Sequence, residues 1–534
     1  MSIAPSRESP SVHVPDAFNI ASYFIDRNLE LGRGGNVAIL EDGRRLTYAQ
    51  LSEMVNRCGN GLRSLGIEKE NRVLMAMPDS AEFVAAFFGA AKVGAIPIPV
   101  NPASKPEELL YFLNDSGARA LVVQQDIWPQ LLPLLSGAPE LRHVLILNEN
   151  PAQQRAISIE KPKHARFSFE SLADVLQSAS TQLEPLATFK DDIAFFLYTS
   201  GSTGGPKGAV HLQHDMLIAS ELFGRNILQF SETDIAFSAS KLFFAYGLGN
   251  GSYFPFSVGA AAVYCPQRPK PDMILHYIET FRPTLFFSVP TLYAAMLQLP
   301  DRKDLSSIRF AVSAGEALPA EIYAQFKERF GVSILDGIGS TEMLHIFISN
   351  RPGDIRPGSS GKLVPGYEAK ILDDNGTAQP PGEIGNLWIK GDSAAAFYWR
   401  KHQRSKQTMV GEWLVTGDKY YIDPEGYFVY CGRADDLLRC SGQWVSPIEV
   451  ENAMVAHPAI LESAVVGAED TDGLTKPKAY IVLKQGVDSP SAEELRSFLR
   501  ERLAGHKVPR WFEFVNELPK TATGKIQRFR LRNP

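Results

Sequence analysis

The feature that most constrains the fold is an apolar strand that runs directly into a loop of glycines and hydroxyl side chains. The strand is Ile193–Tyr198, and the loop, residues 199–208, also contains Lys207. Glycines allow backbone N–H groups to approach an anion, hydroxyls add donors and a lysine adds charge. Flexible linkers rarely follow a continuous apolar strand directly. The segment therefore predicts a phosphate-binding loop, although Pro206 and Gly208 depart from the Walker A pattern.

The chain around this loop alternates helical and strand patterns. Helical spacing in 51–65 is followed by β-rich runs at 72–77 and 95–100, and the same rhythm returns beyond residue 192. At 534 residues the chain is too long for one compact core. We therefore expect an α/β fold whose large N-terminal domain contains two doubly wound subdomains.

The pattern changes twice more toward the C-terminus. From about Gly358 the strands become short and are broken by turns, which favours a small antiparallel β-barrel that completes the N-terminal domain. After 432–436 a fresh α/β pattern begins, with a helix at 446–455. We place the domain boundary at Asp435, giving an N-terminal domain of 1–434 and a small C-terminal domain of 435–534.

Composition excludes several classes of protein. A formal net charge of −6 gives no basic field for nucleic acid. The most apolar stretch, 83–100, contains Lys92, Pro97 and Pro99, so it predicts a buried helix that runs into a strand rather than a membrane span. The four cysteines lack metal-ligand spacing, which fits a reducing compartment. The first 18 residues are rich in Ser and Pro and lack the apolar stretch of a secretory signal. Both observations favour the cytoplasm.

The loop sequence Tyr-Thr-Ser-Gly-Ser-Thr-Gly-Gly-Pro-Lys-Gly resembles the signature of the adenylate-forming superfamily, which includes acyl-CoA synthetases, adenylation domains and luciferases. The segment 336–342, Asp-Gly-Ile-Gly-Ser-Thr-Glu, resembles a second signature of the same superfamily. The resemblance implies that Thr341 contacts the α-phosphate of ATP and that Glu342 holds Mg²⁺, a hard cation suited to oxygen ligands. Ile338 stands where many relatives have an aromatic residue against adenine. The implied ATP/AMP site comprises Thr199, Ser200, Gly201, Ser202, Thr203, Gly204, Lys207, Ala314, Gly315, Glu316, Asp336, Gly337, Thr341, Asp418 and Arg433.

Motifs nearer the C-terminus extend the resemblance to about residue 532. Asp418 and Arg433 match the positions that bind the ribose, and Asp435 matches a hinge about which the small domain swings. Gly442 and Trp444 lie in the stretch expected to face coenzyme A. Lys525 is the expected catalytic lysine, which bridges the attacking carboxylate and the α-phosphate.

The expected acid pocket contains no acidic residue near Ala245 that could neutralise an amino acid's ammonium group. Small and flat side chains instead resemble those of benzoate-CoA ligases more than those of fatty-acyl enzymes, although core packing alone would also explain aromatic residues here. The pocket comprises Ala245, Tyr246, Gly247, Gly337, Ile338, Gly339, His345 and Ile346.

The resemblance thus implies that benzoate, ATP and CoA give benzoyl-CoA, AMP and diphosphate through a benzoyl-adenylate, with Mg²⁺ as cofactor. Alternatives are another aryl- or medium-chain acyl-CoA synthetase, transfer of the acyl group to a carrier protein, a luciferase-like enzyme, and a non-catalytic nucleotide- or acid-binding relative. His211 and His214 have a possible metal-ligand spacing, but no further ligand residues accompany them, so packing or helix-start roles are favoured. Neither nucleic acid nor membrane is an expected partner, and the sequence leaves open whether the chain forms a homodimer.

Overall fold

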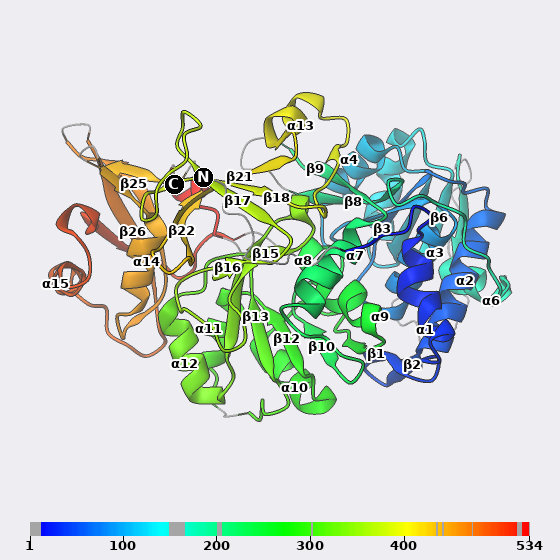
Figure 1. Cartoon of the computed structure of the whole chain (residues 1–534), viewed down its shortest axis with the longest axis horizontal. Coiled ribbons are helices and arrows are strands. Elements are labelled where there is room, and N and C mark those ends of the chain that lie inside the picture. Colours follow the sequence, from blue (N-terminus) through cyan, green and yellow to red (C-terminus); the bar gives the residue numbers. More distant parts are fainter. Residues whose placement is uncertain are drawn as a thin grey trace.

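The computed structural model describes residues 12–148, 166–199, 205–300, 303–433, 436–440, 443–471, 474–520 and 526–532. The side chains of Arg439, Gln443 and Trp444 lie outside this description. In Figure 1 the N-terminal segments lie on the right, the strands of the middle of the chain lie at the centre, and the C-terminal segments lie on the left.

The first layer is a five-stranded sheet with the order β4-β3-β5-β6-β7, in which every neighbouring pair is parallel. Parallel neighbours need crossover connections, which the helices of this segment supply. Helix α3 is buried along its whole length and leads into β4, so the predicted buried helix and strand at 83–100 are confirmed. The strands are β3 (Arg72–Ala76), β4 (Ile96–Pro99), β5 (Ala120–Gln124), β6 (His143–Leu147) and β7 (Ser168–Ser171), and the helices are α2 (Tyr48–Ser64), α3 (Ala81–Lys92), α4 (Pro106–Ser116), α5 (Trp128–Leu131) and α6 (Leu172–Ser178).

The second layer is a nine-stranded sheet with the order β16-β15-β14-β13-β12-β10-β11-β1-β2. The strands from β14 to β1 in this order are parallel, and antiparallel strands close both edges. The expected second doubly wound layer is therefore present. The strands are β1 (Val37–Glu41), β2 (Arg44–Thr47), β10 (Ile235–Ser238), β11 (Ala261–Val263), β12 (Leu285–Ser288), β13 (Phe310–Ser313), β14 (Ile334–Gly339), β15 (Ile346–Ser349) and β16 (Lys362–Leu363), and the helices are α1 (Arg27–Glu30), α7 (Asp215–Ala219), α8 (Ala245–Leu248), α9 (Phe254–Val258), α10 (Pro271–Phe281), α11 (Pro290–Leu297) and α12 (Ala320–Phe330).

Two antiparallel sheets complete the N-terminal part. The unit expected after residue 358 is a five-stranded sheet, and a separate three-stranded sheet has the order β19-β9-β8. The hairpin of β8 and β9 flanks the predicted phosphate loop. The elements are β8 (Ile193–Thr199), β9 (Lys207–Leu212), β17 (Glu368–Leu372), β18 (Gly385–Lys390), β19 (Phe397–Tyr398), α13 (His402–Thr408), β20 (Met409–Val410), β21 (Trp413–Ile422) and β22 (Phe428–Arg433).

The C-terminal segments form an α/β unit with hydrophobic clusters of its own. Its first long helix, α14, begins as the sequence predicts, because the Ser446 hydroxyl accepts from the Glu449 N–H (3.2 Å) and Pro447 occupies the first turn. The boundary residue Asp435 lies outside the described residues, so the boundary stays a prediction. The elements are β23 (Leu438–Cys440), β24 (Gln443–Val445), α14 (Pro447–Val455), β25 (Ile460–Glu469), β26 (Thr475–Leu483), α15 (Ala492–Arg500), β27 (Trp511–Phe514) and α16 (Phe529–Arg532).

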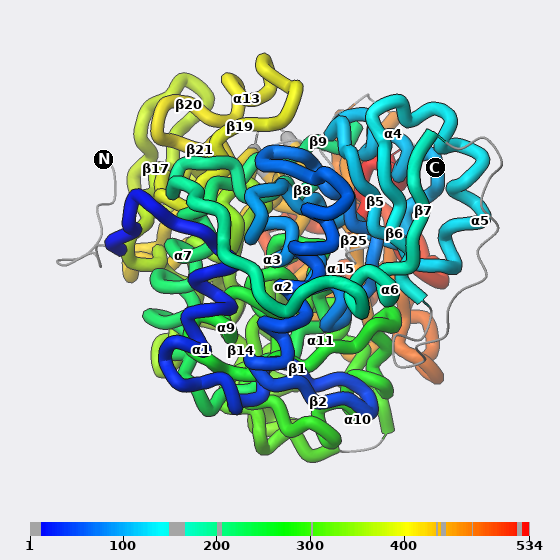
Figure 2. Tube along the Cα trace, turned by 90° about the vertical axis from the view of Figure 1, so that its right-hand side faces the viewer, coloured from blue at the N-terminus to red at the C-terminus, as the bar shows by residue number. Residues whose placement is uncertain are grey.

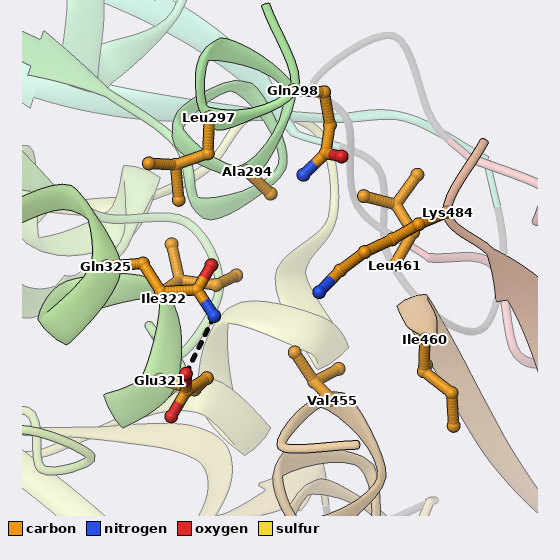
Figure 3. Close-up of a pocket in the computed structure, with 10 residues that line it drawn as sticks. All are labelled: Ala294, Leu297, Gln298, Glu321, Ile322, Gln325, Val455, Ile460, Leu461 and Lys484. Carbon is orange, nitrogen blue, oxygen red and sulfur yellow. Dashed lines mark hydrogen bonds between the residues drawn. The ribbon is translucent and has the colours of Figure 1, made fainter. Parts of the chain in front are cut away.

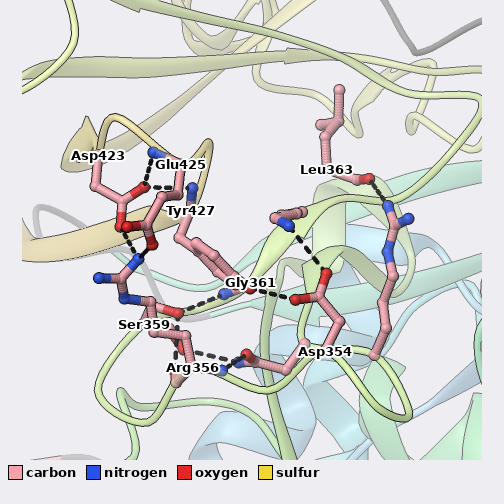
Figure 4. Close-up of polar contacts among 11 residues, drawn as sticks. Asp354, Arg356, Ser359, Gly361, Leu363, Asp423, Glu425 and Tyr427 are labelled. Atoms are coloured by element: carbon pink, nitrogen blue, oxygen red, sulfur yellow. Dashed lines mark hydrogen bonds and ion pairs between the residues drawn. The ribbon is translucent and has the colours of Figure 1, made fainter.

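Side-chain packing joins the N-terminal layers into one body. A single hydrophobic cluster extends from α2 and α3 through β8 and the nine-stranded sheet to β18 and β21. On the surface, a polar cluster ties the loop after β15 to the turn between β21 and β22 (Figure 4). There Arg356 forms an ion pair with Asp423 (2.8 Å) and another with Glu425, while the Tyr427 hydroxyl donates to Asp354. These contacts fix the position of β22 relative to the nine-stranded sheet.

The C-terminal unit meets α11 and α12 at a junction that contains both apolar and polar side chains (Figure 3). The cavity left there measures about 10 Å³, close to the smallest that holds one water molecule. The residues around it are Ala294, Leu297, Gln298, Glu321, Ile322, Gln325, Val455, Ile460, Leu461 and Lys484.

The state of the cysteines and the character of the helices can be compared with the sequence analysis. All four cysteines, Cys58, Cys265, Cys431 and Cys440, are buried free thiols. Among the helices that the structure describes, none has both the length and the apolar character needed to cross a membrane.

The close contact of α2 and α3 generates a stability prediction (Figure 2). A Cβ at Gly89 would lie 2.9 Å from the Cys58 Cβ and 2.9 Å from the Gly59 N atom. Gly89→Ala is therefore expected to lower the free energy of unfolding by about 1–3 kcal/mol, measured by urea unfolding. Gly35→Ala is the control, because a Cβ there meets no atom within 4 Å. Equal stability of the two variants would contradict the helix contact.

Candidate functional site

The carboxyl ends of β12, β13 and β14 form one edge of the nine-stranded sheet. The register places Ser288 beside Ser313, and Ser313 beside Asp336. Ser288 Oγ is buried and has no hydrogen-bond partner in the described part of the chain. Ligands of open parallel sheets bind outside this edge, so the row marks the candidate site.

Asp336 is buried at this edge, and burial raises the pKa of its carboxyl group to about 8. The Leu318 N–H donates to its Oδ2 (3.2 Å), and its backbone carbonyl accepts from the Asn350 N–H (2.9 Å). The loop after β13, which contains Ala314, Gly315 and Glu316, lies between β13 and Leu318. The structure therefore brings this predicted loop next to Asp336.

The hairpin of β8 and β9 presents the ends of the predicted phosphate loop. Thr199 pairs with Lys207 across the hairpin, so both flank the loop. Lys207 Nζ lies 4.6 Å from the centre of the Tyr398 ring, and burial lowers the pKa of its ammonium group. The other predicted phosphate-loop residues, Ser200, Gly201, Ser202, Thr203 and Gly204, lie outside the described residues.

Thr341 and Glu342 begin a single helical turn directly after β14. The Ser340 hydroxyl caps the turn by accepting from the Met343 N–H (3.2 Å). The Tyr398 hydroxyl donates to Glu342 Oε1 (2.5 Å), and the Ala395 N–H donates to the Glu342 carbonyl (2.7 Å). The segment 395–398 therefore holds Glu342, the predicted metal ligand, and its Tyr398 also contacts Lys207.

Asp418 and Arg433 face each other on neighbouring strands. They are direct register partners on β21 and β22, and Arg433 Nη1 lies 3.0 Å from Asp418 Oδ1. The Asp418 carboxylate raises the pKa of the Arg433 guanidinium. Gly417, with φ +75°, precedes Asp418, and a Cβ there would lie 3.0 Å from Arg433 Nη2. The two predicted ribose-binding residues thus form one charged pair, with glycine required beside it.

The predicted acid pocket is assembled from α8 and from the segment around β14 and β15. The Tyr246 hydroxyl donates to the Val312 carbonyl (3.1 Å), which fixes the ring below β13. The rings of Tyr246 and His345 have centroids 5.4 Å apart. Gly339 has no room for a side chain, because a Cβ would lie 2.4 Å from the His345 carbonyl oxygen. Ala245 and Ile346 are buried, Ile338 is partly buried, and Gly247 and Gly337 also leave no room for a Cβ.

His345 is enclosed by aromatic side chains. Its ring centroid lies 4.4 Å from that of Phe254 and 5.3 Å from that of Phe223. Its Nε2 lies 3.1 Å from Asn250 Oδ1, and because an amide oxygen only accepts, Nε2 carries the proton. Burial lowers the pKa of His345 to about 3. The ring is therefore neutral near pH 7.

The segment after Lys525 reaches the nucleotide side of the site. The Ile526 N–H donates to Glu316 Oε1 (2.9 Å). Lys525 itself, the hinge residue Asp435 and Gly442 lie outside the described residues, as does the side chain of Trp444.

Sequence reasoning missed several residues that hold the site. Tyr398 contacts both Lys207 and Glu342, Asn250 orients His345, and Asp215 pairs with His211. Tyr398 lies in a short, exposed-looking stretch without a recognisable motif. The i, i+4 spacing of His211 and Asp215 was the one available signal.

Comparisons with known proteins cover nearly the whole chain. Residues 28–399 match the family described as AMP-binding enzyme, and residues 449–525 match the AMP-binding enzyme C-terminal domain. The chain is 46% identical over 99% of its length to the benzoate–CoA ligase of Thauera aromatica, of which 98% is covered. It is 40% identical to the 4-hydroxybenzoate–CoA/benzoate–CoA ligase of Rhodopseudomonas palustris, with 96% of this chain and 94% of that protein covered.

Solved structures agree with these sequence matches. The anthranilate CoA ligase AuaEII in complex with anthranoyl-AMP aligns with a TM-score of 0.91 and 43% identity, covering 97% of both chains. A benzoate CoA ligase from Burkholderia xenovorans LB400 aligns with a TM-score of 0.87 and 43% identity, covering 97% of this chain and all of the other.

The buried His345 predicts a specific dependence of stability on pH. In the unfolded chain its pKa is about 6.5, so between pH 6.5 and about 3 the unfolded state binds more protons at this position. The free energy of unfolding should therefore fall as the pH falls through this window. His345→Gln is expected to remove this contribution, which changes by up to about 1.4 kcal/mol per pH unit.

Urea unfolding at about pH 7 and about pH 5 measures this effect. His276→Gln, at an exposed histidine, is the control and should leave the pH dependence unchanged. If His345→Gln keeps the wild-type pH dependence, the histidine is not held neutral by burial.

Proposed function

The chain belongs to the family of AMP-binding enzymes, and on this basis we propose that it is an ATP-dependent aryl acid–CoA ligase with benzoate as its leading substrate. In the first half-reaction, a carboxylate oxygen of the acid attacks the α-phosphorus of ATP, the bond to the β-phosphate oxygen breaks, and diphosphate leaves. In the second, the sulfur of CoA attacks the acyl carbon, the bond to AMP breaks, and the thiol proton passes to solvent.

The charged residues around the phosphate loop fit the first half-reaction. We assign Lys207 and Thr341 to the phosphates, and Glu342 to Mg²⁺, because a carboxylate is the ligand type that this cation prefers. Bound Mg²⁺ would neutralise charge on the phosphates. Tyr398 holds the Glu342 carboxylate toward Lys207, so the anionic metal ligand and the cationic phosphate ligand share one support. Lys525 is assigned to the charge that develops between the carboxylate and the α-phosphate.

The nucleoside is assigned to the sheet edge and the charged pair. The carboxylate of Asp418 can accept from both ribose hydroxyls while Arg433 holds one of its oxygens. The row of Ser288, Ser313 and Asp336 and the loop of Ala314, Gly315 and Glu316 border the adenine side.

One observation supports the choice of an aryl acid: the predicted pocket residues bring the rings of Tyr246 and His345 together, and none of these pocket residues is an acid that would meet an ammonium group. The rings of Tyr246 and the neutral His345 are tilted by 42° with their centroids 5.4 Å apart, and Gly247, Gly337 and Gly339 leave no room for a Cβ. An amino acid would bring a buried unpaired cation, which is costly. The pocket therefore favours a compact flat acid.

A basic hollow in the C-terminal unit is the place we propose for the phosphates of CoA. Its volume is about 270 Å³, and Cys440 in its wall directly precedes the 441–447 stretch predicted to face CoA. Cationic side chains suit phosphate oxygens. The lining residues are Cys440, Lys476, Pro477, Arg496, Arg500, Gly505, His506, Val508, Pro509 and Arg510.

Two further parts of the proposal concern the state of the protein in the cell. The buried free thiols support a reducing compartment such as the cytoplasm. A homodimer is the hypothesis for the oligomeric state, which light scattering can test.

The function is tested by AMP release with ATP, Mg²⁺ and CoA across benzoate, 2-fluorobenzoate, 4-hydroxybenzoate, phenylacetate, hexanoate and phenylalanine. Benzoate and its smallest analogues should lead, and release should require CoA. Lys525→Ala should lower benzoate-dependent ATP–diphosphate exchange by at least about 100-fold while thioester formation from synthetic benzoyl-adenylate continues. Fastest turnover of hexanoate or phenylalanine would refute the acid pocket, and unchanged exchange in Lys525→Ala would refute the assigned lysine.

The CoA site is tested with Arg510→Gln. Losing one cation from the hollow should raise the KM for CoA by about 10-fold, as expected for a charge-assisted hydrogen bond, while ATP–diphosphate exchange stays unchanged. Arg502→Gln, on the same unit but outside the hollow, is the matched control. A KM for CoA equal to that of the control would contradict the assignment.

A further inference from the structure

A buried histidine outside the assigned set connects the phosphate-loop hairpin to the Thr341–Glu342 turn. His211 lies on β9, four residues after Lys207, and its side chain is fully buried. Its Nε2 lies 2.8 Å from the Thr341 carbonyl oxygen, and its Nδ1 lies 2.7 Å from Asp215 Oδ2. The ring stacks on Phe195 of β8, with centroids 5.1 Å apart. It therefore bridges two groups on opposite sides.

The chemistry of the two partners fixes the ring's role. A carbonyl oxygen only accepts hydrogen bonds, so Nε2 must carry a hydrogen and donate to Thr341. The bond on the other side holds the ring in this orientation. Asp215 is itself fixed, because the Leu212 N–H donates to the same Oδ2 (3.2 Å). Backbone, carboxylate, imidazole and carbonyl thus form one continuous buried chain.

This chain ends at the residue before the assigned metal ligand. Glu342 is held through its own carbonyl by Ala395 and through its carboxylate by Tyr398. Tyr398 pairs in register with Ala209 of β9, the strand that also carries His211 and Lys207. Ser393 Oγ donates to the Met343 carbonyl of the same turn (2.9 Å). Among the described hydrogen bonds of the turn, the one from His211 to the Thr341 carbonyl ties it directly to β9.

A metal-binding role for His211 does not fit this geometry. Both ring nitrogens are directed at oxygen atoms of the protein at hydrogen-bond distance. A search of the described residues for groups of three or more His, Cys, Asp or Glu side chains that could hold a metal ion finds none.

We propose that His211, oriented by Asp215, is a positioning residue for the adenylation half-reaction: its Nε2–H holds the Thr341 carbonyl and thereby sets the place of the Thr341 and Glu342 side chains. The proposal rests on the proposed function, since it concerns the same turn. A displacement of about 1 Å in such a group can cost about 100-fold in rate. The thioester-forming half-reaction does not need the turn to hold the triphosphate and should not depend on His211.

Two variants of similar polarity separate positioning from simple filling of the core. In His211→Gln the side-chain amide can reach the place of Nε2 and still donate to Thr341. In His211→Asn the shorter amide reaches the place of Nδ1 and contacts Asp215 instead. Positioning predicts that ATP–diphosphate exchange falls by no more than about 10-fold in the Gln variant and by about 100-fold in the Asn variant. Both should convert synthetic benzoyl-adenylate and CoA to thioester at close to the wild-type rate.

Thermal unfolding of both variants shows whether the fold is kept. If His211→Asn does not fold, Asp215→Asn takes its place, with a loss between those of the two histidine variants because an amide can still form a hydrogen bond with Nδ1. Equal loss of exchange in the Gln and Asn variants, or equal loss in both half-reactions, would overturn the proposal.

A separate measurement distinguishes this inference from the proposed function. The Mg²⁺ concentration needed for ATP binding, followed by calorimetry without any acid, should rise in His211→Asn and change little in His211→Gln. If the wild type activates none of the acids, the proposed function fails, but a higher Mg²⁺ requirement in His211→Asn than in His211→Gln still supports the positioning role. If the two variants have the same Mg²⁺ requirement, the positioning role fails whatever acid is activated.

Discussion

The pairing of β9 with β8 on one side and β19 on the other is the constraint on which the site depends. It places Lys207 across from Thr199 at the base of the phosphate loop, and it brings Tyr398 from a distant part of the chain to the same place. A slip of one residue would turn the side chains of β9 to the opposite face. Lys207 and His211 would then both leave the Thr341–Glu342 turn, since residues four apart share one face of a strand. The register of a short sheet thus decides the geometry of the phosphate site.

The sequence predicted the parts of the site that are local and missed those that are held by distant contacts. The cap of α14 and the buried α3 follow from neighbouring residues, and both were predicted. The Asp418 and Arg433 motifs indicated two ribose ligands, but not that they are register partners, because a motif does not specify strand pairing. Tyr398 and His211 were missed as supports for the same reason. Helix α15 ends at Arg500, although apolar residues at helical spacing continue to Leu503.

In the proposed acid pocket, burial would select a substrate without a specific hydrogen bond. His345 is surrounded by rings, and its neutral form costs less to bury than its cationic form. The same environment would penalise any charged group on the distal end of a substrate. In the proposed function the carboxylate of the acid would therefore point toward Lys207, and the ring would face Tyr246. The difference in polarity between the two ends of the proposed site would set the orientation of the substrate.

The C-terminal unit has hydrophobic clusters of its own and also packs against the N-terminal part of the chain. Val455 of α14 packs against the cluster that contains residues of α11 and α12, and Leu461 lines the cavity at the same junction. Separating the two parts would expose this apolar surface, at a free-energy cost in proportion to its area. In the arrangement seen here, the Ile526 N–H is bound by Glu316, which holds the residue next to Lys525 at the nucleotide side. This contact supports the proposed role of Lys525 in adenylation, because it brings the neighbouring residue next to Glu316 of the predicted nucleotide loop.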